Sequence, residues 1–363
     1  MIRLKKFIEL LNEQHLEGFL ITSRTDIRYL SGFTGSAGML WVSPEKNVFI
    51  TDFRYKTQAK KQVGESAEIF ITSPEKAYFD ILEELEVFKE KRFVGFDSVA
   101  TSYSSYRRLT ARFLGNNFIP VDNPLTEIRQ VKEPEEITKI EGAAQIAIEA
   151  LAEVLPLLRP GITEKEFSTE LEYHLNRKGS EKSAFDIIVA SGKNAALPHA
   201  KASEKVIETG DMVTIDFGAI YEGYASDITR TYFIGTPDDK FKKIYELVLQ
   251  AQSAAIKGAK AGLTGKEIDA IARKVIEDAG YGEYFGHGLG HGIGLVVHDA
   301  PTLNKRGEKV VPENSVVTIE PGIYIPEWGG IRIEDDFVVE TDGVRCITSE
   351  LPKNLIDIII PVG

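Results

Sequence analysis

Three of the six histidines in the chain lie within one glycine-rich segment. This segment runs His287-Gly-Leu-Gly-His291-Gly-Ile-Gly-Leu-Val-Val-His298, with its imidazoles four and seven positions apart. Alternating glycines let the backbone turn sharply and approach other groups closely, so these imidazoles can face one site. For this segment alone, the alternative is a structural turn whose histidines are solvated.

Four carboxylates interrupt or end apolar segments that have strand character. They are Asp216 in Thr214-Ile-Asp-Phe, Asp227 in Ala225-Ser-Asp-Ile, Glu320 after Val316-Val-Thr-Ile, and Glu334 after Gly329-Gly-Ile-Arg-Ile. A single carboxylate at a strand end is usually a solvated surface group. The turn residues between Asp216 and Asp227, including Glu222-Gly223, predict a hairpin that folds the second carboxylate back beside the first.

If four carboxylates and one imidazole gather in one cleft, they require bound cations. Bare anions there would suffer severe desolvation and mutual repulsion. Two bridging carboxylates would hold two divalent ions roughly 3.5 Å apart, a spacing suited to a shared hydroxide. Ligation by oxygen and one nitrogen, without sulfur, favours Mn²⁺ or Co²⁺ over a structural zinc site.

The first part of the chain, residues 1–123, alternates helix-like and strand-like segments. Strands are expected at 19–21, 39–42, 48–51, 68–72, 93–96 and 118–121, and helices at 4–11, 78–88 and 103–114. This alternation predicts an α/β domain with a mixed or parallel sheet. The domain contains no G-x-G-x-x-G or Walker motif, so it supports no nucleotide-binding hypothesis.

A second domain, residues 124–363, is expected after the turn-like Val121-Asp-Asn-Pro-Leu, with Pro134 able to open its first helix. Helices at about 134–157, 163–178, 238–260 and 265–279 alternate with strand-rich segments at 184–235 and from 316 onward. The resulting αα-ββ-αα-ββ order suggests a duplicated half, although no repeat is visible at the level of residues.

Composition argues against several classes of partner and site. No stretch reaches the roughly 20 apolar residues of a membrane helix, and the charged start of the chain does not resemble a secretory signal. The net charge of −12 leaves no basic surplus for a nucleic-acid backbone. The single cysteine, Cys346, can form neither an intramolecular disulfide nor a thiolate metal site. We expect a cytoplasmic protein that binds neither nucleic acid nor membrane.

In their order and spacing, these motifs closely resemble those of the Xaa-Pro peptidases, the pita-bread aminopeptidases and dipeptidases specific for proline. The resemblance rests on Asp216, Asp227, the segment 287–299, Glu320-Pro-Gly and Arg332-Ile-Glu334, and it extends to Tyr29-Leu-Ser-Gly-Phe-Thr-Gly-Ser and Thr51-Asp-Phe-Arg-Tyr55. It implies a creatinase-like α/β N-terminal domain, residues 1–123. An α+β pita-bread catalytic domain, residues 124–363, would follow.

The resemblance also assigns the metal ligands residue by residue. Asp216 would bind one ion through both oxygens, Asp227 and Glu334 would bridge the pair, and His291 and Glu320 would complete the second ion. Two divalent ions per chain are implied, Mn²⁺ first, with Co²⁺ and Zn²⁺ as alternatives. A homodimer is expected as well.

The remaining roles implied by the resemblance concern the substrate. His199, in Leu197-Pro-His-Ala, and His298 would contact the scissile carbonyl and stabilise its developing negative charge. His287 would line the substrate cleft, and Glu320 would move a proton from the nucleophile to the leaving nitrogen. Tyr324 and Arg332 would orient the ligands.

The expected activity is that of an Xaa-Pro aminopeptidase, which releases the first residue of a peptide whose second residue is proline. Dipeptidases of this family commonly place an arginine shortly after the histidine equivalent to His298, where it can hold a free carboxylate. Thr302 stands there in this chain. The main alternative is an Xaa-Pro dipeptidase (prolidase). A methionine aminopeptidase, a non-catalytic binding module on the same fold and a metal-free creatinase-like hydrolase are less favoured, since the full ligand set and an N-terminal domain are both present.

Overall fold

The computed structural model describes residues 2–88 and 92–362. The chain folds into two compact units, Met1–Ile128 and Arg129–Gly363. The division falls within the short helix α6 (Thr126–Gln130). The expectation that residues 1–123 and 124–363 form separate domains stays a prediction.

The first unit is built on a six-stranded mixed sheet with the order β4-β3-β2-β1-β5-β6. Its strands are β1 (Gly18–Ile21), β2 (Met39–Val42), β3 (Val48–Thr51), β4 (Glu68–Ile71), β5 (Phe93–Asp97) and β6 (Asn117–Val121). The central strand β1 runs antiparallel to β2 and parallel to β5. All six strands predicted from short apolar runs are present, each within one residue of its expected ends.

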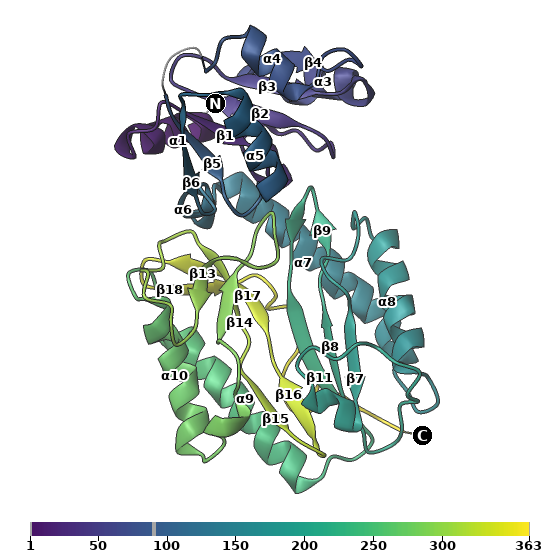
Figure 1. Cartoon of the computed structure of the whole chain (residues 1–363). Helices are drawn as coiled ribbons and strands as arrows, with labels where there is room; N and C mark the ends of the chain where they lie inside the picture. Colours follow the sequence, from purple (N-terminus) through teal and green to yellow (C-terminus); the bar gives the residue numbers. More distant parts are fainter. Residues whose placement is uncertain (1, 89–91, 363) are drawn as a thin grey trace. The chain divides into compact units, whose positions relative to one another are not determined.

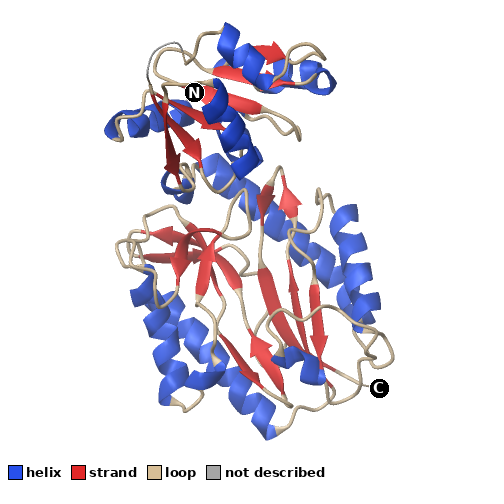
Figure 2. Cartoon of the chain, viewed as in Figure 1, coloured by secondary structure: helices blue, strands red, loops and turns tan. Residues whose placement is uncertain are grey.

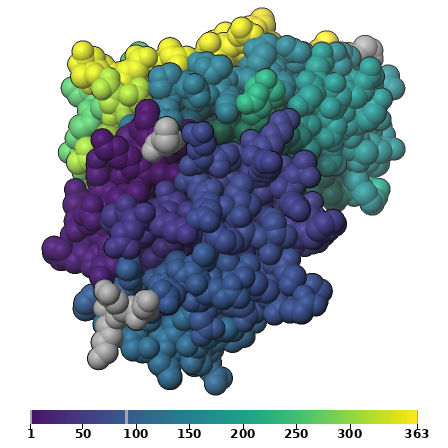
Figure 3. All heavy atoms as spheres, turned by 90° about the horizontal axis from the view of Figure 1, so that it is seen from above, coloured from purple at the N-terminus to yellow at the C-terminus, as the bar shows by residue number. Residues whose placement is uncertain are grey.

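Helices flank this sheet and supply the rest of the first core. They are α1 (Ile2–Glu13), α2 (Arg24–Ser31), α3 (Lys56–Gln62), α4 (Tyr78–Glu84) and α5 (Tyr103–Arg112). Helix α4 ends earlier than the predicted 78–88, because Glu86 adopts a left-handed conformation with φ 53° that a helix cannot continue through. In the space-filling view the residues of this unit, purple to blue, form a continuous body (Figure 3).

The second unit contains two larger sheets and two short ribbons. The four-stranded sheet has the order β19-β11-β8-β7, and the five-stranded sheet has the order β13-β12-β14-β17-β18. The strands of the first are β7 (Ile188–Ser191), β8 (Met212–Phe217), β11 (Ile228–Ile234) and β19 (Ile359–Ile360). Those of the second are β12 (Gly290–Gly292), β13 (Asp299–Leu303), β14 (Val316–Ile319), β17 (Asp335–Glu340) and β18 (Gly343–Cys346). The ribbons pair β9 (Ile220–Tyr221) with β10 (Tyr224–Ala225) and β15 (Gly322–Ile325) with β16 (Gly329–Arg332).

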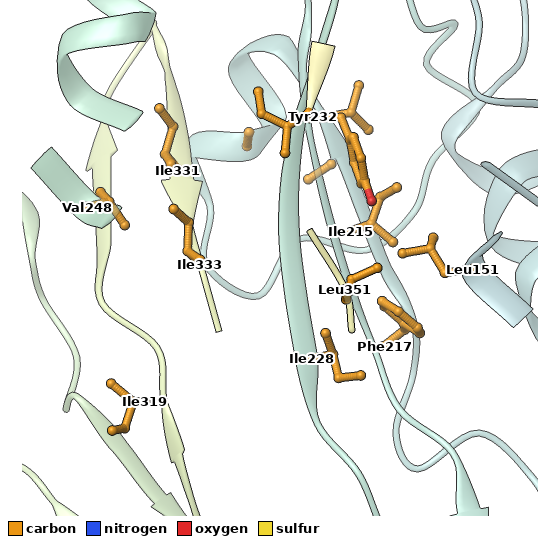
Figure 4. Packing of buried hydrophobic residues seen from close by; sticks show 14 of the residues in the cluster. Leu151, Ile215, Phe217, Ile228, Tyr232, Val248, Ile319, Ile331, Ile333 and Leu351 are labelled. Carbon is orange, nitrogen blue, oxygen red and sulfur yellow. The ribbon is translucent and has the colours of Figure 1, made fainter. Parts of the chain in front are cut away.

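Four long helices enclose these strands. Helices α7 (Pro134–Val154) and α8 (Glu164–Arg177) lie along one flank of the sheets, and α9 (Asp239–Gly258) and α10 (Gly265–Asp278) along the other (Figures 1 and 2). Their apolar faces pack against the strands in one continuous core. Figure 4 shows Leu151 of α7 near Phe217 and Val248 of α9 near Ile331 and Ile333. Within the described residues, no helix combines the length and apolar character needed to span a membrane.

The two halves of this unit repeat one another at the start of their second helix. Gly161-Ile-Thr-Glu-Lys-Glu opens α8, and Gly262-Leu-Thr-Gly-Lys-Glu opens α10. In each half the threonine and the last glutamate form a reciprocal capping box. A short residue-level repeat is therefore present, contrary to the expectation from the sequence, and the suggested duplication stays a prediction.

Backbone hydrogen bonds extend the correspondence beyond the helix starts. Gly161 donates to Ile207 O as Gly262 donates to Val311 O, both at 3.0 Å. Lys165 donates to Ser203 O at 3.0 Å, and its counterpart Lys266 donates to Gly307 O at 2.8 Å. The loop that precedes β8 thus matches the loop that precedes β14, residue for residue at these positions.

Candidate metal centre

One acid-imidazole group forms where the two sheets of the second unit meet. Asp227 directly precedes β11, Glu334 directly precedes β17, and His291 lies in β12. One ligand atom from each of these three side chains lies within 4.8 Å of the others. Three residues from three separate segments therefore offer their ligand atoms to a single point.

Strand pairing explains why the acids converge. The predicted hairpin is present, because β8 and β11 pair antiparallel, with Asp216 opposite Thr229. Thr229 also forms an isolated antiparallel bridge with Glu334, and its hydroxyl donates to Glu334 Oε2 at 2.6 Å. Thr229 thus aligns the segments that carry Asp216, Asp227 and Glu334.

Glu320 lies on the other side of His291. His291 Nε2 is 3.5 Å from Glu320 Oε1 and 3.6 Å from Asp227 Oδ2. These separations are long for hydrogen bonds but suit two ligand atoms that each lie about 2.1 Å from one shared ion. Thr318 supports both sides, since it accepts from His291 N at 3.1 Å and donates to Glu320 Oε1 at 3.3 Å.

The imidazole of His291 is prepared for metal ligation. Burial is the main cause that lowers its pKa to about 4, which leaves the ring neutral at physiological pH. Its Nδ1 lies 3.1 Å from Gly292 O. Because a carbonyl oxygen only accepts hydrogen bonds, this contact places the ring proton on Nδ1 and leaves the Nε2 lone pair toward the acids.

Asp216 is held beside the group by Arg332. Arg332 Nη2 donates to Asp216 Oδ2 at 2.6 Å, and Arg332 Nε donates to Thr229 Oγ1 at 3.0 Å. The second oxygen, Asp216 Oδ1, is buried and has no hydrogen-bond partner among the described residues. An orphaned carboxylate oxygen next to three further acids fits a ligand of a bound cation.

The acids repel one another strongly in this setting. Desolvation, followed by the charge of Glu334, raises the pKa of Asp227 well above its ordinary value. Desolvation and the charge of Glu320 likewise raise the pKa of Glu334. Burial raises the pKa of Glu320 to about 8, against the opposing effect of Arg332. Divalent cations would remove this penalty, so the residues present fit a metal centre.

The predicted orienting residues form a chain that leads to His287. Arg332 Nη1 donates to the Tyr324 hydroxyl at 2.8 Å, and that hydroxyl lies 2.9 Å from His287 Nε2. His287 Nδ1 lies 2.7 Å from Gly288 O, so it carries the proton and Nε2 accepts from Tyr324. His287 Nδ1 is also 4.0 Å from Glu320 Oε2, which places this imidazole at the edge of the acid group.

The other two predicted histidines are exposed and lie nearby. The ring of His298 is 4.4 Å from that of His291, measured between centroids. His199 follows Pro198, whose carbonyl accepts from Arg332 Nη1 at 3.4 Å. The residues predicted for the site therefore lie at or beside the acid group, although among the described residues only Asp227, His291 and Glu334 have ligand atoms that all lie within 4.8 Å of one another.

Three supporting residues were not predicted from the sequence. Thr229 and Thr318 position the acids as described above, and Asp336 accepts a 3.0 Å hydrogen bond from the backbone N–H of Asp227. Threonines within strands are common, and the acidic run Glu334-Asp-Asp resembles a solvated surface. The three consecutive polar residues Thr229-Arg-Thr, just after Asp227, offered a signal, because polar side chains that are buried in a strand need hydrogen-bond partners.

Comparison with known proteins agrees with this geometry. Residues 138–341 match the model of metallopeptidase family M24, and residues 3–131 match the creatinase/prolidase N-terminal domain. The chain is a member of metallopeptidase family M24. It is therefore a metal-dependent peptide hydrolase, with a creatinase-type N-terminal domain and a pita-bread catalytic domain, as the sequence predicted.

Three relatives show how far the similarity extends. An uncharacterized peptidase of Bacillus subtilis is 45% identical over 98% of this chain and 99% of its own length. A solved Xaa-Pro dipeptidase from Bacillus anthracis is 45% identical, with a TM-score of 0.94 and coverage of 99% of both chains. A solved X-Pro aminopeptidase from Thermotoga maritima is 41% identical, with a TM-score of 0.89, and the match covers 98% of this chain and 99% of that one.

The acid group generates a first prediction about metal content. Asp227→Asn and Glu334→Gln should each lower the metal bound per chain of the peptidase and remove most activity, because an amide cannot supply a second anionic contact. Elemental analysis and turnover would be measured beside Glu340→Gln, an exposed acid at the far end of β17. Metal content and turnover like those of the parent would contradict the role of these two acids.

A second prediction concerns stability of the metal-free peptidase between pH 6.5 and 8. Because the folded pKa of Glu320 is raised from 4.5 to about 8, its contribution to stability is lost as pH rises through this window. His287 and His291, whose pKa values fall from 6.5 to about 4, contribute with the opposite sign only below about pH 6.5. The Tm of chelated protein should therefore fall from pH 6.5 to 8.

Calorimetry with and without Mn²⁺ checks this expectation. Added metal should flatten the fall in Tm, because the cation favours the ionised carboxylates. Glu320→Gln should flatten part of it without metal. A metal-free Tm that stays constant or rises over the window would contradict the raised carboxyl pKa.

Proposed function

We propose that this peptidase is a cytoplasmic Xaa-Pro aminopeptidase that uses two divalent cations, Mn²⁺ before Co²⁺ or Zn²⁺. The acid-imidazole group supports a hydrolytic metal centre. The observation that carries the choice of an aminopeptidase is Thr302, a short neutral side chain where dipeptidases of the family commonly place an arginine.

The ligands divide between two ions as the resemblance implies. Asp227 and Glu334 would be shared by both ions, Asp216 would hold one ion, and His291 with Glu320 would hold the other. The unpartnered Asp216 Oδ1 and the neutral imidazole of His291 support these two residues as ligands. Four oxygen donors and one nitrogen favour Mn²⁺.

Bound cations would lower the pKa of a water molecule between them and polarise the scissile carbonyl. Glu320 would move a proton from the nucleophile to the leaving nitrogen. His199 and His298 donate to the carbonyl oxygen as negative charge develops there. His287, held by Tyr324, lines the cleft beside them.

Proline at the second position of the peptide determines which bond is cleaved. The nitrogen of an Xaa-Pro bond carries no hydrogen, and its ring fixes φ, so general peptidases accept it poorly. A cleft shaped for the ring makes this bond the selected one. The substrate is therefore a peptide with a free N-terminus and proline in second place.

The position of Thr302 is consistent with an open cleft. Thr302 lies on β13 directly opposite His291 on β12, and paired residues of antiparallel strands project to the same face. Its side chain is exposed. A peptide that continues beyond proline would meet no charged group at this position.

An Xaa-Pro dipeptidase remains the second candidate, and it is favoured by the dipeptidase solved from Bacillus anthracis, which matches nearly all of this chain. The Thermotoga maritima relative is titled an aminopeptidase, so similarity alone leaves both activities open. A methionine aminopeptidase and a non-catalytic module are less favoured, because the creatinase-type domain and all five expected ligand residues occur together in this chain.

The proposal also includes location and assembly. A single cysteine, which permits no intramolecular disulfide, suits the reducing cytoplasm. A homodimer is proposed from the resemblance to the family, and analytical ultracentrifugation of the purified chain tests it.

Product analysis tests the activity. Enzyme reconstituted separately with Mn²⁺, Co²⁺ and Zn²⁺ should release alanine from Ala-Pro-Ala, most rapidly with Mn²⁺ or Co²⁺, and leave Met-Ala-Ala intact. Mass spectrometry identifies the products. Cleavage of Ala-Pro alone would replace the aminopeptidase assignment with a dipeptidase, and release of methionine would exclude proline specificity.

Substitution of Thr302 tests whether this residue favours an aminopeptidase over a dipeptidase. Thr302→Arg should raise activity on Ala-Pro relative to Ala-Pro-Ala, because a charge-assisted pair with the free carboxylate is worth roughly 1.5 to 3 kcal/mol, or about ten- to a hundredfold. Thr302→Gln, of similar length without the charge, is the matched control. If the parent and Thr302→Arg show the same ratio of activity on Ala-Pro to activity on Ala-Pro-Ala, position 302 does not distinguish dipeptides from longer peptides.

A further inference from the structure

His199 lies in a segment with few internal supports. The segment runs from Ser191, the last residue of β7, to Ser203, and it contains only a short 3₁₀ helix, Gly192–Ala196. Leu197 is 60% exposed and His199 is also exposed. Such a segment needs an external anchor if the imidazole is to hold one position.

A single buried carboxylate supplies that anchor. Glu164, the first residue of α8, is completely buried. Its Oε1 accepts from Ser191 N at 2.7 Å, Ser191 Oγ at 2.8 Å and Asn194 Nδ2 at 3.0 Å. Its Oε2 accepts from Ser203 N at 3.1 Å and Ser203 Oγ at 2.6 Å. The two oxygens therefore hold opposite ends of the segment that carries His199.

Formation of the helix does not require this glutamate. The N-terminus of α8 is capped by Thr163 and Glu166, and the equivalent helix α10 has the same capping box. At the position equivalent to Glu164, α10 has Gly265. Glu164 is thus specific to the half that carries His199.

The matching loop of the second half is arranged differently. The counterpart of Ser203 is Gly307, as the paired backbone bonds show. A Cβ on Gly265 would lie 1.9 Å from Thr302 O, so backbone fills the space there. The first half replaces this close backbone contact with a carboxylate and its hydroxyl partners.

The anchored segment contacts the metal centre through Arg332. Pro198 O accepts from Arg332 Nη1, which also binds the Tyr324 hydroxyl. Ala195 O packs so closely on Gly330 of β16 that a Cβ there would lie 2.1 Å away. Arg332 and Glu334 lie two residues apart in the chain. Displacement of the segment would therefore move His199 relative to both.

We propose that Glu164 is a positioning residue of this peptidase, which holds His199 over the scissile carbonyl by fixing both ends of segment 191–203. This inference rests on the proposed role of His199. Glu164 touches neither metal ligand nor substrate. Glutamine has nearly the same shape as glutamate, but its amide nitrogen is a hydrogen-bond donor. This nitrogen would face other donors, so the hydrogen bonds at one end of the segment would be lost.

Two glutamate variants from one helix turn separate positioning from helix stability. Glu164→Gln and Glu166→Gln both remove a negative charge near the N-terminus of α8, but within the described part of the chain the Glu166 carboxylate accepts hydrogen bonds only from Thr163. Glu164→Gln should lower kcat by about ten- to a hundredfold with unchanged metal content. Amide hydrogen exchange in residues 192–203 should accelerate in Glu164→Gln and remain at the parent rate in Glu166→Gln.

A double-mutant cycle with His199→Ala decides whether the effect passes through the imidazole. In the His199→Ala background, Glu164→Gln should cause no further loss of kcat. An equal loss in both backgrounds, or exchange rates in 192–203 unchanged by Glu164→Gln, would overturn the proposal. If His199→Ala alone retains the activity of the parent, the proposed role of His199 is wrong. The exchange rates in 192–203 would still show whether Glu164 holds the segment in place.

A milder substitution, Ser203→Gly, tests the proposal if Glu164→Gln does not fold. Ser203→Gly reproduces the residue found in the second half and removes one hydroxyl donor from Glu164. Its effects should be of the same kind as those of Glu164→Gln, but smaller. Amide exchange in 192–203 should be faster than in the parent, and the loss of kcat should disappear in the His199→Ala background. Parent-like exchange and kcat in Ser203→Gly would count against the anchor.

Discussion

The buried carboxylates of the second unit impose the constraint on which the rest of the site depends. Asp216, Asp227 and Glu334 are each at most 9% exposed, and Glu320 lies beside them. The pKa values of Asp227, Glu320 and Glu334 are raised by desolvation and by neighbouring acids. Such a group is stable only if it is protonated or if cations neutralise it. The fold holds the acids together at a cost that metal binding offsets.

The surrounding donors are arranged so that ligation remains possible. Arg332 neutralises part of the negative charge, yet it bonds only one oxygen of Asp216 and leaves the other free. Thr229 takes one oxygen of Glu334 and is itself held by Arg332. Each support thus orients a carboxylate without occupying both of its oxygens. The same arginine holds Tyr324, so the orientation of the acids and that of His287 are linked.

The two halves of the second unit share a similar frame, which consists of a helix start and its backbone bonds to a loop, but the two frames hold different groups. Both halves start a helix with the same capping box and the same backbone bonds. The frame of the second half packs backbone on Gly265, next to the strands that carry His291 and Thr302. The frame of the first half encloses Glu164, which holds both ends of segment 191–203. The frame of the second half therefore lies beside His291 in a strand, whereas that of the first half supports His199 in a loop.

Residue types and their order were enough to predict the chemistry of this protein, and short apolar runs were enough to predict the strands of the first unit. The reactivity of acidic residues and histidines follows from the type of side chain, so the sequence alone shows which reactive groups are present. The supporting contacts could not be predicted in this way. The bonds from Arg332 to Asp216 and from Glu164 to Ser203 join residues that are distant in sequence, and they depend on strand register and on how two halves pack. The sequence determined which groups can react, while the tertiary structure decided which oxygen of each acid stays free, because hydrogen bonds between distant segments form only once those segments have folded together.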